Sequence, residues 1–177
     1  NIVDDIPEFS VECMAEQKRT ARESRKDGSS WDGADSLEFD VSDATEFFGY
    51  FKSEGEAKVV AIACEGEVAN SIKANENGII ITDKTPFYAE SGGQAGDTGV
   101  ITVGENTFEV TNTTKDADGV ILHHGVLSGD AVKVGDRTVA AYYECKRKAT
   151  MRNHTAAHLL QAALRKVLGT HVEQAGQ

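Results

Sequence analysis

Cysteine and basic residues are both scarce in this sequence. The three cysteines, Cys13, Cys64 and Cys145, are far apart and form no Cys-x-x-Cys pair, which argues against a disulfide framework or a zinc ribbon. Lys and Arg number 18 against 29 Asp and Glu, so the formal net charge is −11. Because neutralisation of phosphates by Lys and Arg dominates nucleic-acid affinity, we do not expect this chain to hold a polyanion unaided.

Long apolar runs are absent as well. No stretch approaches the roughly 20 residues needed to cross a bilayer, and no basic segment followed by an apolar one marks a secretory signal. These absences favour a cytoplasmic protein without a membrane partner. The chain begins at Asn1 without a methionine, so we interpret it as a piece of a longer protein.

The composition divides the chain into three parts. Residues 1–35 combine a polar connector helix that starts near Pro7 with a linker rich in Gly, Ser and Asp. Residues 36–144 carry short runs of β-branched and aromatic residues between turn residues, which is typical of a β-sandwich or a closed β-barrel. Residues 145–177 include a stretch, 146–168, without proline or glycine and with apolar residues at helical spacing. The predicted strands are 37–41, 47–50, 58–64, 71–74, 78–82, 99–103, 107–111, 119–124 and 138–143. The predicted fold class is α+β, mainly β, with a helix at each end.

His154 and His158 lie one turn apart on the predicted C-terminal helix. Two imidazoles at this spacing are the commonest way for a helix to offer zinc two nitrogens, and the alternative is a pair of polar residues at a surface. The residue after His154 is Thr155, and not the Glu that acts as general base in zinc peptidases, so a peptidase is disfavoured. The apolar face of the same helix, which includes Leu160 and Val167, is predicted to be buried.

A glycine-dense stretch occupies residues 90–99, with the sequence Glu-Ser-Gly-Gly-Gln-Ala-Gly-Asp-Thr-Gly. Glycines let the backbone adopt positive φ and let a ligand or another surface approach the amides. The stretch has neither the Gly-Lys-Ser/Thr of a phosphate-binding loop nor the Gly-x-Gly-x-x-Gly of a dinucleotide site. A tight turn accounts for the glycines, but it does not account for Glu90 or Gln94.

Two other motifs are interpreted as structural. Residues 116–119, Asp-Ala-Asp-Gly, lack the downstream Glu and the spacing of a calcium-binding EF-hand loop, so they favour a hairpin turn. His123 and His124 end a predicted strand, where adjacent side chains point to opposite faces and cannot chelate one ion together.

Three motifs together resemble alanyl-tRNA synthetase. Residues 153–160, Asn-His-Thr-Ala-Ala-His-Leu-Leu, followed by His-Val-Glu-Gln-Ala-Gly at 171–176, are similar to the opening of that family's editing domain. Residues 85–99 resemble the second signature of the same domain, and residues 45–50, Thr-Glu-Phe-Phe-Gly-Tyr, resemble the start of its β-subdomain. The resemblance covers nearly the whole chain and implies a translation-factor-like β-barrel between the connector helix and the first helix of the editing core.

The resemblance also implies a site and an activity. The parent would be an ATP-dependent alanine–tRNA ligase with tRNA-Ala as its partner, and the pocket would hydrolyse the ester of seryl- or glycyl-tRNA made in error. Thr85 corresponds to the threonine that senses the serine hydroxyl, and Gln174 corresponds to a glutamine beside the zinc. The implied candidates are Thr85, Gln94 and Gln174 for catalysis, Gly92 and Gly93 for the pocket lining, and His154 and His158 as Zn²⁺ ligands. The family's remaining ligands come from a Cys-x-x-x-His motif that these 177 residues do not contain.

Two alternatives stay open beside this interpretation. One is a non-catalytic β-barrel module that spaces domains or docks the tRNA end. The other is a free-standing trans-editing hydrolase, which residues 45–50 and the connector disfavour. The isolated chain is expected to be inactive because two ligands hold zinc weakly, and the apolar stripe of its C-terminal helix is expected to drive self-association.

Overall fold

The computed structural model describes residue 39 and residues 44–172. The connector helix and linker predicted within residues 1–35, most of the predicted strand 37–41, and Gln174 lie outside the described residues. Among the residues that are described, no helix is long and apolar enough to cross a membrane.

The described part of the chain is mostly β-structure followed by one long helix. Its elements are β1 (Glu46–Phe47), β2 (Glu54–Cys64), β3 (Glu67–Ala69), β4 (Ser71–Lys73), β5 (Asn77–Thr82), β6 (Lys84–Thr85), β7 (Gly99–Val103), β8 (Asn106–Lys115), β9 (Ile121–Ser128), β10 (Ala131–Lys133), β11 (Arg137–Tyr142) and α2 (Glu144–Leu168).

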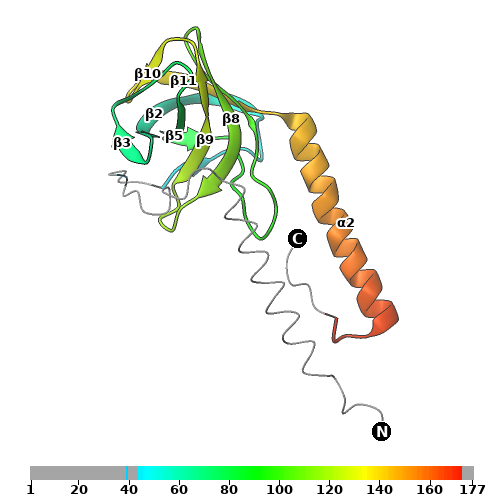
Figure 1. Cartoon of the computed structure of the whole chain (residues 1–177). Coiled ribbons are helices and arrows are strands. Elements are labelled where there is room, and N and C mark those ends of the chain that lie inside the picture. The colour runs from blue at the N-terminus through cyan, green and yellow to red at the C-terminus, as the bar shows by residue number, and fades with distance from the viewer. Residues whose placement is uncertain (1–38, 40–43, 173–177) are drawn as a thin grey trace. The chain divides into compact units, whose positions relative to one another are not determined.

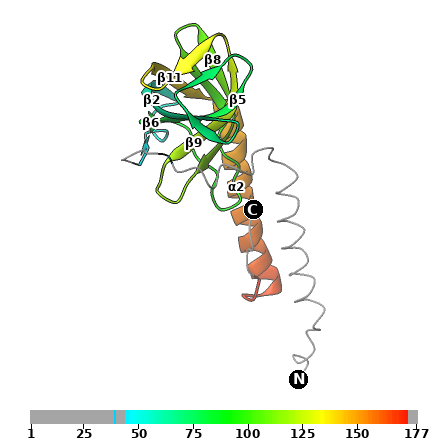
Figure 2. The same ribbon diagram turned by 60° about the vertical axis from the view of Figure 1, so that its left-hand side comes forward.

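Six of these strands close into a barrel. They pair in the order β11-β7-β8-β9-β5-β2, and β11 then pairs with the first half of β2, where Arg137 lies opposite Lys58. All of these pairings are antiparallel. Closure removes the two open edges that a flat sheet of the same strands would leave. Figures 1 and 2 show the closed strands from two sides. The predicted mainly-β fold with a closed barrel is therefore confirmed.

The barrel core follows from the alternation of side chains along the strands. In β7, Gly99, Ile101 and Val103 are buried while the residues between them are partly exposed, which is the period of two expected for a strand with one face inside. One core cluster draws side chains from most of the barrel strands and includes Val59, Ile62, Ile72, Ile80, Phe87, Ile101, Phe108, Val110 and Leu127. Burial of these apolar surfaces is the main driving force for the barrel.

Two register shifts and one hairpin turn shape the barrel strands. The pairing of β8 with β9 shifts between Val110 and Asn112, and the pairing of β2 with β5 shifts between Val59 and Ala61. Such bulges bend a strand and increase its twist. At the tip of the β8–β9 hairpin, Asp116 Oδ1 accepts the backbone N–H groups of residues 118 and 120 at 3.0 and 2.8 Å. The predicted hairpin turn is thus confirmed.

The predicted strand 47–50 is only partly present. It survives as Glu46–Phe47 in β1, because the chain turns directly afterwards and the Phe51 N–H bonds the Phe48 carbonyl at 3.0 Å. Gly49 sits in this turn, where an added Cβ would lie 2.0 Å from the Pro86 carbonyl oxygen. The short strands β3, β6 and β10 were not predicted, since two or three residues carry too little periodicity to be recognised.

The predicted C-terminal helix is confirmed as α2, but its predicted buried face is wrong. The helix ends at Leu168, and Gly169 follows with φ of 113° and donates its N–H to the Arg165 carbonyl. No residue of α2 is buried, and Leu160 and Val167 are 61% and 79% exposed. Helical spacing determines which side chains share a face, but it does not determine whether anything covers that face.

Candidate functional site

The glycine loop, defined here as residues 89–96, closes on itself at its base. Tyr88 donates its N–H to Asp97 Oδ2 at 2.7 Å, and Asp97 returns its own N–H to the Tyr88 carbonyl at 2.9 Å. Inside the loop, the Glu90 N–H bonds the Thr113 carbonyl on β8 at 2.8 Å. The loop is therefore fixed to the barrel wall at both ends.

The tip of the glycine loop is a two-residue turn. Ser91 and Gln94 exchange backbone hydrogen bonds of 3.2 and 2.9 Å, and between them Gly92 and Gly93 have φ of 61° and 87°. Two consecutive residues of positive φ are characteristic of a type I′ turn, which glycine adopts without strain. Residues 91–93 are exposed, so the turn presents its backbone to solvent. Gln94, the last residue of the turn, is half-buried.

Gly96 allows the loop to lie flat on β8. A Cβ at this position would lie 2.2 Å from the Thr113 carbonyl oxygen and 2.8 Å from Asn112 Oδ1. Because the nearest obstacle is backbone, which cannot rotate away, any side chain here would push the loop off the barrel.

Thr85 belongs to a buried hydrogen-bond network under the glycine loop. Its hydroxyl lies 2.8 Å from His123 Nε2 and accepts the Phe87 N–H at 3.2 Å, and both Thr85 and His123 are fully buried. His123 Nδ1 lies 2.8 Å from the Ile80 carbonyl, which can only accept, so the Nδ1 atom carries the proton. The Thr85 hydroxyl then donates to Nε2. Both hydrogen-bonding functions of this hydroxyl are engaged inside the wall, and it does not line an open surface.

The same burial controls the charge of the two adjacent histidines. Burial lowers the pKa of His123 to about 4, against a smaller opposing effect of its bond to Ile80, so the ring is neutral at pH 7. Burial also lowers the pKa of His124, whose Nε2 lies 2.7 Å from the Thr114 hydroxyl. The two rings have separate partners, which agrees with their predicted structural role.

His154 and His158 bring their ring nitrogens together on α2. The two Nε2 atoms are 2.9 Å apart, and the ring centroids are 4.5 Å apart. Two corners of a tetrahedral zinc site with Zn–N bonds of about 2.0–2.1 Å lie about 3.3 Å apart, so a small ring rotation fits the pair to such an ion. Within residues 44–172, no cluster of three or more His, Cys, Asp or Glu residues could hold a metal. The pair offers two nitrogens at a spacing compatible with one ion, and the described residues add no third ligand to form a cluster.

The predicted site residues fall into two groups in the structure. Thr85 and the loop residues Gly92, Gly93 and Gln94 belong to the same part of the barrel. Thr113 on β8 accepts a hydrogen bond from the glycine loop and lies opposite His123 on β9, which in turn bonds the Thr85 hydroxyl. The His154–His158 pair belongs to α2 instead. Gln174 lies outside the described residues.

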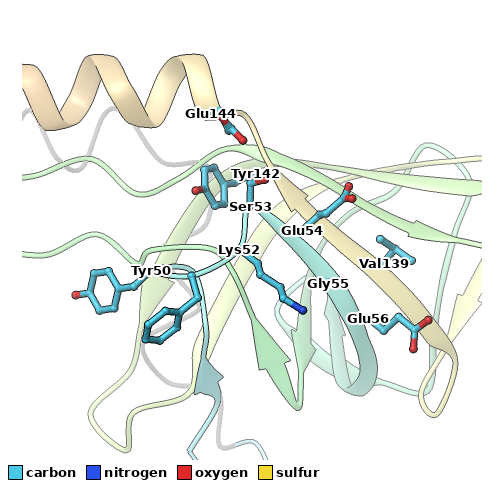
Figure 3. A pocket seen from close by; sticks show the side chains of 10 residues that line it. Tyr50, Lys52, Ser53, Glu54, Gly55, Glu56, Val139, Tyr142 and Glu144 are labelled. Atoms are coloured by element: carbon cyan, nitrogen blue, oxygen red, sulfur yellow. The ribbon is translucent and has the colours of Figure 1, made fainter.

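A shallow hollow at the base of α2 contains none of the predicted site residues. Its volume is about 720 Å³, and its lining, drawn in Figure 3, consists of Tyr50, Phe51, Lys52, Ser53, Glu54, Gly55, Glu56, Val139, Tyr142 and Glu144. Three of the lining residues are glutamates and only one is a lysine, so its charge opposes the phosphates of a nucleic acid. The hollow is a poor candidate for the predicted ester-hydrolysing pocket.

Sequence reasoning missed Arg147, in the first turn of α2. Its Nε donates to Asp97 Oδ2 at 2.9 Å, and Nη2 also contacts that oxygen. Nη1 donates to the Gly49 carbonyl and Nη2 to the Pro86 carbonyl, each at 2.7 Å. The guanidinium also lies 3.4 Å from the centre of the Tyr142 ring. The one signal in the sequence was Asp97, an acidic residue within the glycine-dense motif, but no local pattern points to a partner 50 positions away.

Comparison with known proteins assigns the chain to a family. Residues 1–147 match the family model described as tRNA synthetases class II (A). The alanine–tRNA ligase of Nitrosomonas europaea is 43% identical over 175 residues, which cover 99% of this chain and 20% of that protein. The alanine–tRNA ligase of Delftia acidovorans is 47% identical over 164 residues, covering 93% of the chain and 18% of that protein.

A third relative shows the same relationship over a shorter range. The alanine–tRNA ligase of Pseudomonas syringae pv. tomato is 47% identical over 136 residues, which cover 77% of the chain and 15% of that protein. The chain thus spans about a fifth or less of the curated relatives that it matches. We conclude that it belongs to the class II (A) tRNA synthetase family and corresponds to a segment of an alanine–tRNA ligase.

Proposed function

We propose that this chain supplies one wall and half of the metal site of a pocket that hydrolyses mischarged tRNA within an alanine–tRNA ligase. The parent would charge tRNA-Ala with alanine at the expense of ATP, and the pocket would act on seryl- or glycyl-tRNA-Ala. The convergence of His154 and His158 Nε2 atoms, 2.9 Å apart on a helix of a chain related to alanine–tRNA ligases, carries this proposal.

The chemical need for such a pocket is general. A hydrophobic site discriminates weakly against a substrate that only adds a hydroxyl, so a synthetase gains accuracy from a second site that destroys the wrong product. The formal charge of −11 means that other parts of the parent must provide most of the affinity for tRNA. In this proposal the chain contacts the aminoacyl ester at the 3′ end of the tRNA and contributes little to binding the rest of the tRNA.

The residues of this chain have distinct roles in the proposal. The His154 and His158 nitrogens would hold zinc, which polarises carbonyls and activates water at neutral pH. The turn at Gly92 and Gly93 would present bare backbone to the tRNA end, with Gln94 beside it as a polar contact. Gln174 lies outside the described residues, and the family's remaining ligands lie outside this sequence, so both stay in the proposal through the family resemblance alone.

For Thr85 we propose a different role from the one that the family resemblance implies. To sense a serine hydroxyl directly, its own hydroxyl would have to leave either His123 or the Phe87 N–H. Its contacts instead support a positioning role, in which it ties the segment before the glycine loop to strand β9. We therefore propose Thr85 as a support for the wall of the pocket.

A non-catalytic module remains the second candidate. It is supported by the half-complete metal site among the described residues and by the acidic lining of the hollow at the base of α2. In that case the barrel would space the domains of the ligase or dock the tRNA end.

The experiment that separates these functions uses the full-length ligase. We expect the double variant His154→Ala/His158→Ala to lose hydrolysis of preformed seryl-tRNA-Ala by on the order of 100-fold or more, because the substrate and water are no longer oriented. Alanylation of tRNA-Ala should stay near normal. His171→Ala, which alters an exposed histidine just beyond α2, serves as the matched control. Unchanged hydrolysis in the double variant would favour the spacer module.

Two further properties belong to this proposal. We place the parent ligase in the cytoplasm, since the scattered cysteines give no sign of an oxidising compartment. We also propose that the isolated chain self-associates through α2, whose exposed apolar side chains are Met151, Leu159, Leu160, Val167 and Leu168.

A further inference from the structure

We propose that Arg147 and Asp97 form a joint that sets the position of the two-histidine helix relative to the glycine loop, and that ester hydrolysis in the parent depends on this joint. Neither residue is proposed to touch the substrate, so both are positioning residues. The functional half of this inference rests on the function proposed above, whereas the structural half stands on the contacts alone.

Asp97 is the point at which the glycine loop is fastened. Its backbone N–H and its Oδ2 atom close the loop on Tyr88, and its carbonyl accepts the Thr113 hydroxyl at 2.8 Å. The Asp97 side chain is only 8% exposed. A shift of this carboxylate would therefore move the stem of the loop with it.

Arg147 connects that carboxylate to two other segments. Its guanidinium donates to Asp97, to the Gly49 carbonyl in the turn after β1 and to the Pro86 carbonyl after β6. The side chain is 12% exposed, and its guanidinium carbon lies 3.4 Å from the centre of the Tyr142 ring at the end of β11. A planar fork with several N–H groups can serve these acceptors together, whereas the single ammonium of a lysine cannot.

The backbone around Arg147 reinforces the same attachment. The Tyr143 N–H donates to the Thr98 carbonyl at 2.8 Å, directly after Asp97. The Tyr143 carbonyl then accepts the N–H groups of Lys146 and Arg147 at 3.0 and 3.1 Å, which starts α2. The root of the helix and the stem of the glycine loop are thus joined by both main chain and side chain.

The position of the histidines depends on this root because no residue of α2 is buried, so packing along the rest of the helix does not fix it. His154 and His158 lie seven and eleven residues beyond Arg147, or about 10 and 16 Å along the helix axis. A tilt of about 10° at the root would move them by roughly 2 and 3 Å. Since a misplacement of about 1 Å can cost on the order of 100-fold in rate, a loosened joint is enough to stop the reaction.

The design of the variants follows from the energetics of buried charge pairs. Removing one partner leaves the other charge buried and uncompensated, which destabilises the fold, whereas replacing both is often nearly neutral. We therefore combine Arg147→Met with Asp97→Asn, since the Asn oxygen can still accept the Tyr88 N–H. Arg147→Lys is the conservative variant. Lys148→Gln is the control in the same helical turn, because Lys148 forms an exposed pair with Glu144.

The joint itself is tested by a distance measurement on this chain. With the native cysteines replaced by serine, spin labels at Glu105→Cys in the β7–β8 turn and Lys166→Cys near the end of α2 report the helix position. The labelled chain is diluted into unlabelled chain to suppress intermolecular distances. We expect one narrow distance distribution for the native pair and for Lys148→Gln, and a broad one for the double variant while its barrel still unfolds cooperatively. A broad distance distribution in the native chain, or an unchanged distribution in the double variant, would show that Arg147 and Asp97 do not fix the position of α2.

The dependence of hydrolysis on the joint is tested in the full-length ligase. We expect the double variant to lower kcat for seryl-tRNA-Ala on the order of 100-fold with little change in KM, while Arg147→Lys falls between it and the native enzyme. Alanylation should be unaffected. Native kcat in a variant with a broadened distance distribution would refute the dependence. If the native ligase itself fails to hydrolyse seryl-tRNA-Ala, the proposed function fails, while the distance measurement still decides whether the joint exists.

Discussion

Acidification from pH 7 to pH 4 should destabilise the barrel through His123. The free histidine has a pKa near 6.5, and burial lowers that of His123 to about 4. Between these values the unfolded chain binds a proton that the folded chain does not. The contribution of His123 to stability is therefore fully present above about pH 6.5 and is lost as the pH falls toward 4. At 1.36 kcal/mol per pKa unit, the free energy of unfolding should fall by about 3 kcal/mol over this range.

Urea titrations of the native chain and of His123→Gln between pH 7 and pH 4 isolate this effect. Carboxylates titrate in the same range, but they do so in both proteins and cancel in the difference. At pH 7 the variant should be less stable by about 1–3 kcal/mol, because it disturbs the bonds to Thr85 and Ile80. Toward pH 4 the advantage of the native chain should shrink by about 3 kcal/mol and can reverse.

His124→Gln is the matched control for this titration. His124 is adjacent in sequence and is only partly buried, so its substitution should change the pH dependence in the same direction but less. Parallel stability curves for the native chain and His123→Gln would refute the reasoning, because they would mean that His123 gains its proton equally in both states.

Three further predictions concern the loop, the metal half-site and the helix. In the full-length ligase, Gly93→Val should lower hydrolysis of seryl-tRNA-Ala but not alanylation, because φ of 87° strains any side chain; equal loss of both would indicate misfolding. The isolated chain should not hydrolyse seryl-tRNA-Ala, because its described part offers only the two proposed metal ligands and no cluster of three; robust, chelator-sensitive hydrolysis would contradict this. Sedimentation at high concentration should show oligomers that Leu160→Glu disperses, and a strictly monomeric native chain would count against this.

Features encoded by local pattern could be predicted from the sequence. The β-branched run at residues 99–103 and the turn chemistry of Asp116 were sufficient to predict a strand and a hairpin, and both are present. The run without proline or glycine predicted α2 nearly to its ends. The spacing of His154 and His158 predicted that their side chains would meet, because residues four apart lie on one face of a helix.

Features that depend on long-range contacts could not be predicted. Thr85 and His123 are 38 positions apart and meet through strand pairing, because His123 on β9 lies opposite Ile80 on β5, shortly before Thr85 in the chain. The sequence, from which a serine-sensing role was expected for Thr85, therefore gave no indication that its hydroxyl is hydrogen-bonded inside the barrel wall. Arg147 appeared as one more basic residue near a helix start, since its acceptors come from three distant segments. The exposure of the α2 stripe likewise depends on what packs against it, and sequence periodicity carries no such information.

The most direct test of a metal half-site at His154 and His158 is the visible spectrum of the full-length ligase loaded with Co²⁺ in place of zinc. Tetrahedral cobalt with nitrogen or sulfur ligands absorbs strongly in the visible range, so the bound ion reports its own geometry. We expect this band in the native ligase and in His171→Ala, and its loss in His154→Ala/His158→Ala at normal alanylation activity. An unchanged band in the double variant would show that the two histidines do not hold the ion.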